Sequence, residues 1–197
     1  INGKKAGALE DNTELDISSG PLPWVIGGGG KQNAYFDGML DEVRLYDTAL
    51  TATQVTDLYE SYNLKKAPEG VVAWWRLEGN GDDELGTSDG TLMNIGDSLF
   101  VDAHTGLGIN MRKGVDSSYI HVPNNDIVDF DSTTSFTISF LVKDDDFSES
   151  MECVFKGATG SDGADKKGKW YALSYNGSAW RMFVDDNTTK TQLDAQA

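Results

Sequence analysis

The sequence predicts an all-β protein, an antiparallel β-sandwich with one short helix. Glycine and Asp/Asn turn signals recur about every ten residues, which is the spacing typical of sandwiches. The segments between these turns alternate apolar and polar side chains, as half-buried strands do. At 197 residues the chain is long enough for one large sandwich or two small domains.

The clearest strand covers residues 135–143, where Phe136, Ile138, Phe140 and Val142 face one way. A hairpin is predicted around Asn176-Gly177, because Asn-Gly is the strongest short-range hairpin signal. Its two strands cover residues 169–175 and 180–184, and further strands are predicted at 42–46, 71–77 and 118–122.

One segment has the helical period instead. Thr51 and Gln54, three residues apart, form a capping box that predicts where the helix begins. Val55, Leu58, Tyr59 and Tyr62 then share one face. We expect this helix to close one end of the sandwich, and residues 65–70 to form a linker after it.

Charge narrows the possible partners. The chain has 32 acidic and 16 basic residues, a net charge of −16. Such a surface repels nucleic acid and anionic lipid, both of which are bound by clustered Lys and Arg. It suits divalent cations and neutral partners. The acidic side chains are explained equally well if they merely keep a secreted protein soluble. No apolar run is long enough for membrane insertion, and Cys153 is the only cysteine, so no intrachain disulfide forms.

Two stretches resemble one known family. Residues 35–46 read Tyr-Phe-Asp-Gly-Met-Leu-Asp-Glu-Val-Arg-Leu-Tyr, and residues 71–77 read Val-Val-Ala-Trp-Trp-Arg-Leu. The first resembles the closing strand of LamG-like jelly rolls, of the concanavalin A-like lectin/glucanase kind. The second, with residues 118–123 and 136–143, resembles the opening of the same domain. The resemblance implies a non-catalytic carbohydrate-binding or adhesion module of a larger secreted or cell-surface protein.

The family's closing segment comes first in this chain and its opening segment second. Residues 1–64 therefore correspond to the C-terminal half of such a sandwich, and residues 71–197 to its N-terminal part. The chain is a fragment across two tandem repeats, one permuted sandwich over residues 1–197, or a sandwich completed by a neighbouring chain. Because it begins at Ile1 without a methionine, we expect it to be part of something longer.

A calcium site is the most credible chemistry. In related jelly rolls the aspartate that begins the closing strand often binds Ca²⁺ beside backbone carbonyls, and the resemblance assigns that position to Asp41. Asp82 and Asp89 follow the opening strand, and their carboxylates are oxygen ligands of the kind that calcium prefers. The competing interpretation is that Asp41 caps the strand or pairs with Arg44.

Catalysis is not expected. Retaining glycosidases need two carboxylates about 5 Å apart, and the E-x-D-x-E strand of jelly-roll glycosidases does not occur in the sequence. His104 and His121 are interpreted as structural or solvated. Convergent acids with a histidine in a cleft would instead favour a lyase or glycosidase.

Exposed aromatic rings would distinguish a lectin from a scaffold. Trp24, Tyr35 and Trp180 are the candidate carbohydrate-binding residues, with a polysaccharide or glycan as the partner. The main alternative is a purely structural repeat of an adhesin, stalk or filament, whose partners are neighbouring repeats of the same protein.

Overall fold

The structure is a computed structural model that describes residues 22–28, 35–60, 67–111, 117–131, 133–143, 150–157, 169–186 and 190–196. The predictions for residues 1–21, for Tyr62 and for the first part of the linker lie outside these residues. The strands are β1 (Trp24–Ile26), β2 (Gly38–Tyr46), β3 (Val71–Trp75), β4 (Thr91–Met93), β5 (Phe100–Asp102), β6 (Leu107–Met111), β7 (Tyr119–Val122), β8 (Thr137–Lys143), β9 (Ser150–Gly157), β10 (Lys169–Asn176), β11 (Ala179–Asp186) and β12 (Lys190–Gln196). The helices are α1 (Ala52–Glu60) and the short 3₁₀ helix η1 (Asp97–Leu99).

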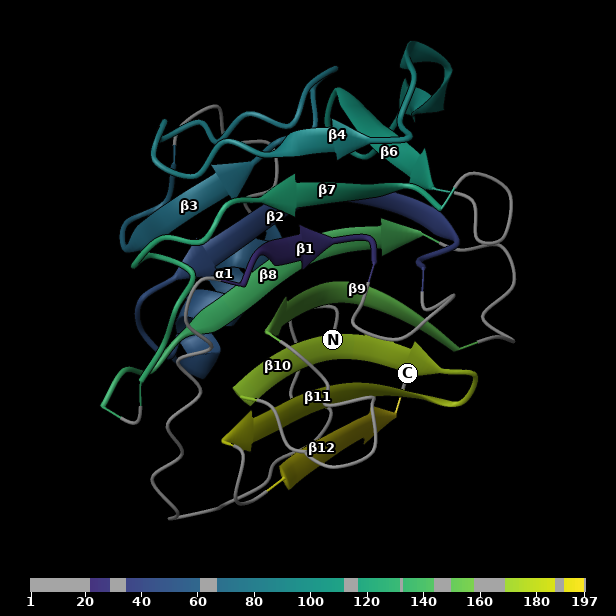
Figure 1. Ribbon diagram of the computed structural model, residues 1–197. Helices are drawn as coiled ribbons and strands as arrows, with labels where there is room; N and C mark the ends of the chain where they lie inside the picture. The colour runs from purple at the N-terminus through teal and green to yellow at the C-terminus, as the bar shows by residue number, and fades with distance from the viewer. Residues whose placement is uncertain are drawn as a thin grey trace.

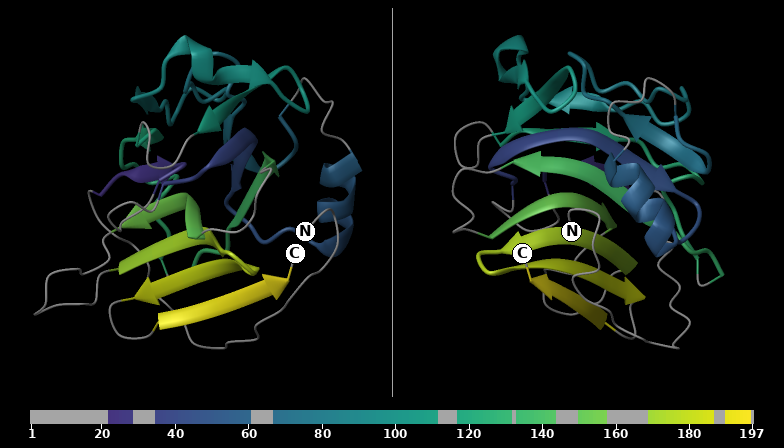
Figure 2. Two further views of the ribbon diagram at one scale, coloured as in Figure 1. Left: turned by 90° about the vertical axis from the view of Figure 1, so that its right-hand side faces the viewer. Right: turned by 180° about the vertical axis from the view of Figure 1, so that it is seen from behind.

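Two antiparallel sheets form the sandwich (Figures 1 and 2). The larger has seven strands in the order β12-β11-β10-β9-β1-β7-β4, and the smaller has the order β3-β2-β6-β5, with β8 paired to β2. The predicted β-sandwich with one α-helix is therefore confirmed over the described residues. The hairpin at Asn176-Gly177 is confirmed as well, since Tyr175 on β10 pairs with Trp180 on β11.

Segments from both ends of the sequence share each sheet. β1 lies between β9 and β7 in the larger sheet. β2 pairs with β3 and β6 and also with β8 in the smaller one. The two halves inferred from the sequence thus fold into one sandwich here, while their assignment to tandem repeats or to a permuted domain stays a prediction.

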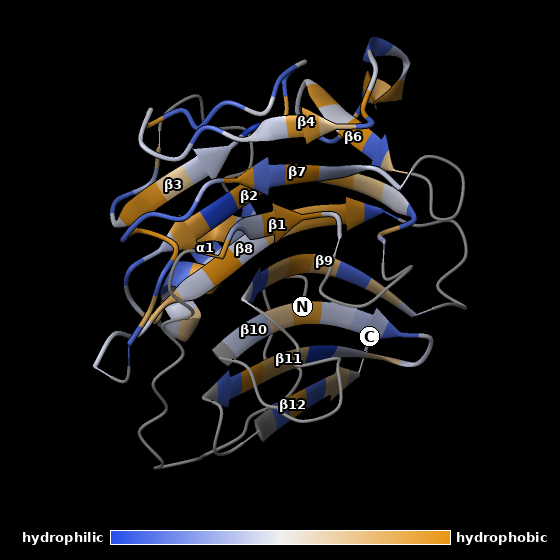
Figure 3. Ribbon diagram, in the orientation of Figure 1, coloured by the Kyte–Doolittle hydropathy of each residue, from blue (hydrophilic) through white to orange (hydrophobic). Residues whose placement is uncertain are grey.

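The core fills the space between the sheets. Its fully buried side chains include Trp24, Trp75 and Ile109. The apolar stretch of β1 covers this core from the larger sheet (Figure 3). The side chains at positions 138, 140 and 142 of β8, and at position 136 just before it, pack against this core, as their alternation predicted. Burying the apolar surface of such side chains is the main favourable term in folding.

The helix begins with the predicted capping box. The Thr51 backbone N–H donates to Gln54 Oε1 at 2.9 Å, and the Gln54 N–H donates to Thr51 Oγ1 at 3.3 Å. Contrary to expectation, α1 does not close an end of the sandwich. It lies on the outside of the smaller sheet (Figure 2), where Leu58 packs with Tyr46 and Leu141. These two side chains alternate with core residues and so point outward.

None of the helices in the described part of the chain is long and apolar enough to span a membrane.

Candidate functional site

A β-bulge in β2 determines where the predicted calcium ligand lies. The register between β2 and β8 shifts between Asp41 and Arg44, and Glu42 has a left-handed backbone with φ of 55°. Because of the extra residue, Leu40 and Val43 both reach the core, although they are three positions apart. Bulges of this kind often redirect a side chain beside a functional site.

Asp41 is an almost completely buried carboxylate, with only 3% of the residue exposed. Its Oδ2 accepts a long hydrogen bond of 3.4 Å from the Thr105 backbone N–H. Its Oδ1 accepts none from the described residues. A buried oxygen without a partner is unusual, since buried polar groups are normally satisfied by hydrogen bonds.

The surroundings of Asp41 oppose its negative charge. Burial, and after it the negative charges of Glu42 and Glu78, raise the pKa of Asp41 to about 7. Glu78 is held by the Leu107 N–H at 3.0 Å and by Arg76 at 3.1 Å. A bound cation would therefore offset the negative charge around the Asp41 carboxylate.

Asp41 lines a cavity of about 410 Å³ on the outer face of the smaller sheet. Asp102, the last residue of β5, and His104, in the β5–β6 connection, line the same cavity and are exposed. The remaining lining residues are Met39, Ala103, Leu141, Val142 and Lys143. Sequence reasoning missed Asp102 and Glu78 because neither lies in a motif, and only the fold brings them near β2.

Glu42 rather than Asp41 pairs with Arg44, so the competing interpretation of Asp41 is wrong in this respect. Arg44 Nη2 lies 2.6 Å from Glu42 Oε2, and the Trp74 indole N–H donates to the same oxygen at 2.7 Å. Arg76 reaches the other Glu42 oxygen at 3.5 Å. Both guanidinium groups also lie over the Trp74 ring, at 4.9 and 5.5 Å from its centroid.

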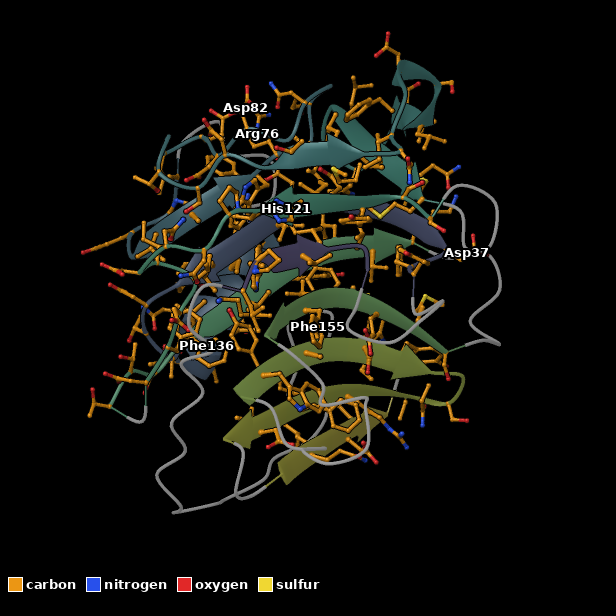
Figure 4. All side chains as sticks on the ribbon, in the orientation of Figure 1. Asp37, Arg76, Asp82, His121, Phe136 and Phe155 are labelled. Atoms are coloured by element: carbon orange, nitrogen blue, oxygen red, sulfur yellow. The ribbon has the colours of Figure 1, made fainter. Side chains whose placement is uncertain are left out.

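The other two predicted ligands lie elsewhere, in the loop after β3. Asp82 and Asp89 are both exposed, and Asp82 appears at the top of Figure 4, near the end of β3. The loop is organised by Asp83, which is 4% exposed. Its carboxylate accepts hydrogen bonds from the backbone N–H groups of Trp74, Leu85, Thr87 and Ser88. Asp89 Oδ1 in turn accepts from the Asp83 N–H at 3.0 Å.

Asp41, Asp82 and Asp89 thus do not form one site. Among the described residues there is no group of three or more His, Cys, Asp or Glu side chains that could hold a metal ion. The physical reason is that the loop carboxylates bind their own backbone, which satisfies the acidic run without a cation. Any cation at Asp41 would have to complete its shell with backbone carbonyls and water, which calcium accepts.

The three predicted carbohydrate-binding aromatics have different surroundings. Trp24 is completely buried, and its ring packs on Trp75 with 4.7 Å between centroids, so no sugar can stack on it. Tyr35 is half-buried and lies 6.2 Å from the equally half-buried Tyr119 of β7. Tyr119 had no signal in the sequence beyond its strand alternation.

Trp180 belongs to an apolar groove instead. Its ring lies 5.3 Å from Tyr175 and 6.3 Å from Phe140. The groove has a volume of about 370 Å³, and its walls come from α1, β8, β10, β11 and β12. Its lining includes Leu58, Leu173, Met182 and Leu193. An apolar surface of this kind fits the apolar side chains of a polypeptide better than the hydroxyl groups of a sugar.

His121 lies on β7, the strand next to the edge strand β4 of the larger sheet (Figure 4), where it pairs with Val25 and Thr91. It does not line the cavity of Asp41 and His104. The two histidines of the chain therefore do not act together.

Comparison with known proteins gives one match. Residues 1–56 match the family model described as the concanavalin A-like lectin/glucanases superfamily. No curated protein and no solved structure matches the chain. The matched segment includes β1 and β2, which contribute one strand to each sheet. Residues 1–56 are thus similar to the concanavalin A-like lectin/glucanases superfamily, and the two-sheet β-sandwich of the described residues agrees with this similarity.

Proposed function

We propose that this chain is a non-catalytic recognition or adhesion module of a larger secreted or cell-surface protein, stabilised by a calcium ion at Asp41. One observation carries the proposal: the Asp41 carboxylate is buried beside Glu42 and Glu78, and its Oδ1 has no hydrogen-bond partner among the described residues. Calcium takes six to eight oxygen ligands and needs no histidine or cysteine.

The residues present fit such an ion. Asp41 Oδ1 would supply the central ligand, and Glu78, 29% exposed at its side chain, would supply or orient a second carboxylate oxygen. The Ala103–Gly106 turn next to them is closed by the Ala103 N–H donating to the Gly106 carbonyl at 3.0 Å. A bound Ca²⁺ would neutralise charge where β2 meets this turn and hold the two segments together.

Thermal unfolding with calcium and with a chelator tests the cation. We expect the melting temperature to rise with Ca²⁺ because only the folded chain assembles the site. At a hundredfold excess over Kd, the free energy of unfolding should increase by about 2.7 kcal/mol. Asp41→Asn should lose most of this shift. Asp82→Asn is the matched control, since Asp82 is exposed in the loop after β3, and it should keep the shift. A melting curve that ignores calcium would contradict the proposal.

The proposed ligand is a glycan, bound at the Tyr35–Tyr119 pair. Two half-exposed rings 6.2 Å apart offer the flat apolar surface on which sugar rings stack. Titration with soluble polysaccharides should show binding that Tyr35→Ala and Tyr119→Ala each weaken. Tyr59→Ala is the matched control, because Tyr59 is 49% exposed on α1, on the other sheet. Equal binding by all three variants would exclude this surface.

A structural repeat is the second candidate, and the apolar groove around Trp180 favours it. Repeats of one protein that contact each other need an apolar surface of this kind. Sedimentation of the chain at increasing concentration and at high salt, which screens its charge of −16, would then show self-association that Met182→Glu abolishes. If the chain stays monomeric at every concentration, the glycan-binding module is the better-supported function.

A lyase or glycosidase has one observation in its favour, the cavity shared by Asp41, Asp102 and His104. We favour a non-catalytic role because the Asp41 carboxylate is almost completely buried, and a general acid or base must reach the proton that it transfers. Incubation with glucans, galactans, alginates and pectins should release no new reducing ends and no unsaturated products. Turnover that His104→Ala abolishes would overturn this assignment.

A further inference from the structure

Lys156 of β9 is a fully buried lysine on the inner face of the larger sheet. It pairs with Trp24 on one side and with Tyr171 on the other, and both of these side chains belong to the core. Fully buried lysines are rare in proteins. The position therefore needs an explanation beyond the packing of an apolar strand.

Three oxygens of described residues lie near the Lys156 ammonium group. Nζ lies 2.6 Å from the Leu22 carbonyl oxygen, 2.6 Å from Asn124 Oδ1 and 3.8 Å from Asp129 Oδ1. Because a carbonyl bond is only about 1.2 Å long, Nζ is also at most about 4 Å from the Asn124 carboxamide carbon. An amine, a carboxamide and a carboxylate thus meet at one point.

This arrangement places an amine beside an electrophilic amide carbon. Burial lowers the pKa of Lys156, although Asp129 opposes the shift, and the neutral amine is the nucleophile. Holding two groups in contact raises their effective concentration to roughly 10⁵–10⁸ M in well-oriented cases. Trp24 and Tyr171 are both fully buried and exclude water from the lysine side of the contact.

We propose that Lys156 and Asn124 join through an intramolecular isopeptide bond, with Asp129 as the catalytic proton carrier. Asp129 takes one proton from the Lys156 ammonium, and the free amine attacks the Asn124 Cγ. The proton on Asp129 then passes to Nδ2, the Cγ–Nδ2 bond breaks, and ammonia leaves with the second proton of Nζ. The products are a secondary amide between Nζ and Cγ and one ammonium ion, and Asp129 is again ionised, with no oxidant, reductant or other co-reactant.

The bond would link the two strands that flank β1. Asn124 follows β7 and Lys156 belongs to β9, and these strands pair with β1 on opposite sides. The chain has Cys153 as its single cysteine, so a disulfide cannot provide this link. A covalent closure between positions 32 apart constrains the unfolded chain as a disulfide does, and it survives reducing conditions.

Intact-mass spectrometry of the folded, purified chain tests the proposal. We expect a mass below that of the sequence by one ammonia molecule. A tryptic map should contain one branched peptide in which Lys156 is joined to Asn124. The map is essential, because an Asn-Gly step such as Asn80-Gly81 loses ammonia too when it forms a succinimide, but it yields no branched peptide.

Variants assign the roles. Three variants should each have the mass calculated from their own sequence, with no loss of ammonia and no branched peptide: Lys156→Gln, Asn124→Ala and Asp129→Asn. Asn80→Ala is the matched control and should keep both. If the folded wild-type chain has the mass calculated from its sequence and gives no branched peptide, the proposal is overturned, whatever the variants show. A branched peptide formed at an undiminished rate in Asp129→Asn would overturn the role of Asp129.

Discussion

Replacing Asp41 by asparagine should stabilise the chain in the absence of calcium, and calcium should remove most of that advantage. The pKa of Asp41 is raised from 3.8 to about 7 in the folded chain. The folded state therefore binds the proton more tightly than the unfolded state does, and the stability of the wild type falls as pH rises from about 4 to about 7. Below this window the carboxyl is protonated in both states and its burial is tolerated.

The size of the effect follows from the shift. A displacement of about three pKa units corresponds to about 4 kcal/mol, since one unit is worth 1.36 kcal/mol. In a chelator at pH 8, Asp41→Asn removes the buried charge and should be more stable than the wild type, by up to about 4 kcal/mol. With calcium in hundredfold excess over Kd, the wild type gains about 2.7 kcal/mol and the variant gains nothing, so that the difference narrows or reverses.

Urea denaturation across pH 4 to 8, with chelator and with calcium, measures all of these quantities. Asp82→Asn is the control, because changes of exposed surface residues usually stay within about 0.5 kcal/mol. Two results would refute the reasoning. One is an Asp41→Asn variant that is less stable than the wild type in chelator at pH 8. The other is a wild type whose stability does not change between pH 4 and 7 relative to the variant.

Three further predictions test the packing of the sandwich. Trp24→Ala should lower the free energy of unfolding by about 3–5 kcal/mol, because Trp24 is a fully buried core residue, and a loss below 1 kcal/mol in urea denaturation would contradict its place there. Glu42→Gln should destabilise by about 3–5 kcal/mol, since it removes the negative charge that lies 2.6 Å from the guanidinium of buried Arg44. Gly27→Ala should cost more than Gly86→Ala. Both have a positive φ, but a Cβ at Gly27 meets the Met111 side chain, whereas at Gly86 it points into open space. Equal melting temperatures for these two variants would show that the Met111 contact is unimportant.

Much of the fold could be predicted from alternation and turn chemistry, because these are local properties of the chain. The strand 135–143 and the Asn176-Gly177 hairpin carry their own register signals, and the structure confirms both. The capping box likewise specified the start of α1. The place of that helix was not local information, since it depends on Tyr46 and Leu141 meeting outside the smaller sheet.

The candidate site was predictable only in part, for a related reason. Asp41 could be found because it heads a recognisable strand, but its partners depend on the bulge at Glu42 and on the β5–β6 connection reaching across β2. Asp82 and Asp83 are adjacent acids with no difference in sequence pattern. The fold separates them, because Asp83 pairs with Trp75 and accepts hydrogen bonds from its own loop, whereas Asp82 is exposed.

The most direct test of the account is a calorimetric titration of Ca²⁺ into the chelator-stripped chain. The account predicts one binding site per chain, which Asp41→Asn abolishes and Asp82→Asn preserves, with proton release below pH 7 as the ion displaces the proton of Asp41. The absence of any calcium binding, or binding that survives Asp41→Asn unchanged, would contradict it.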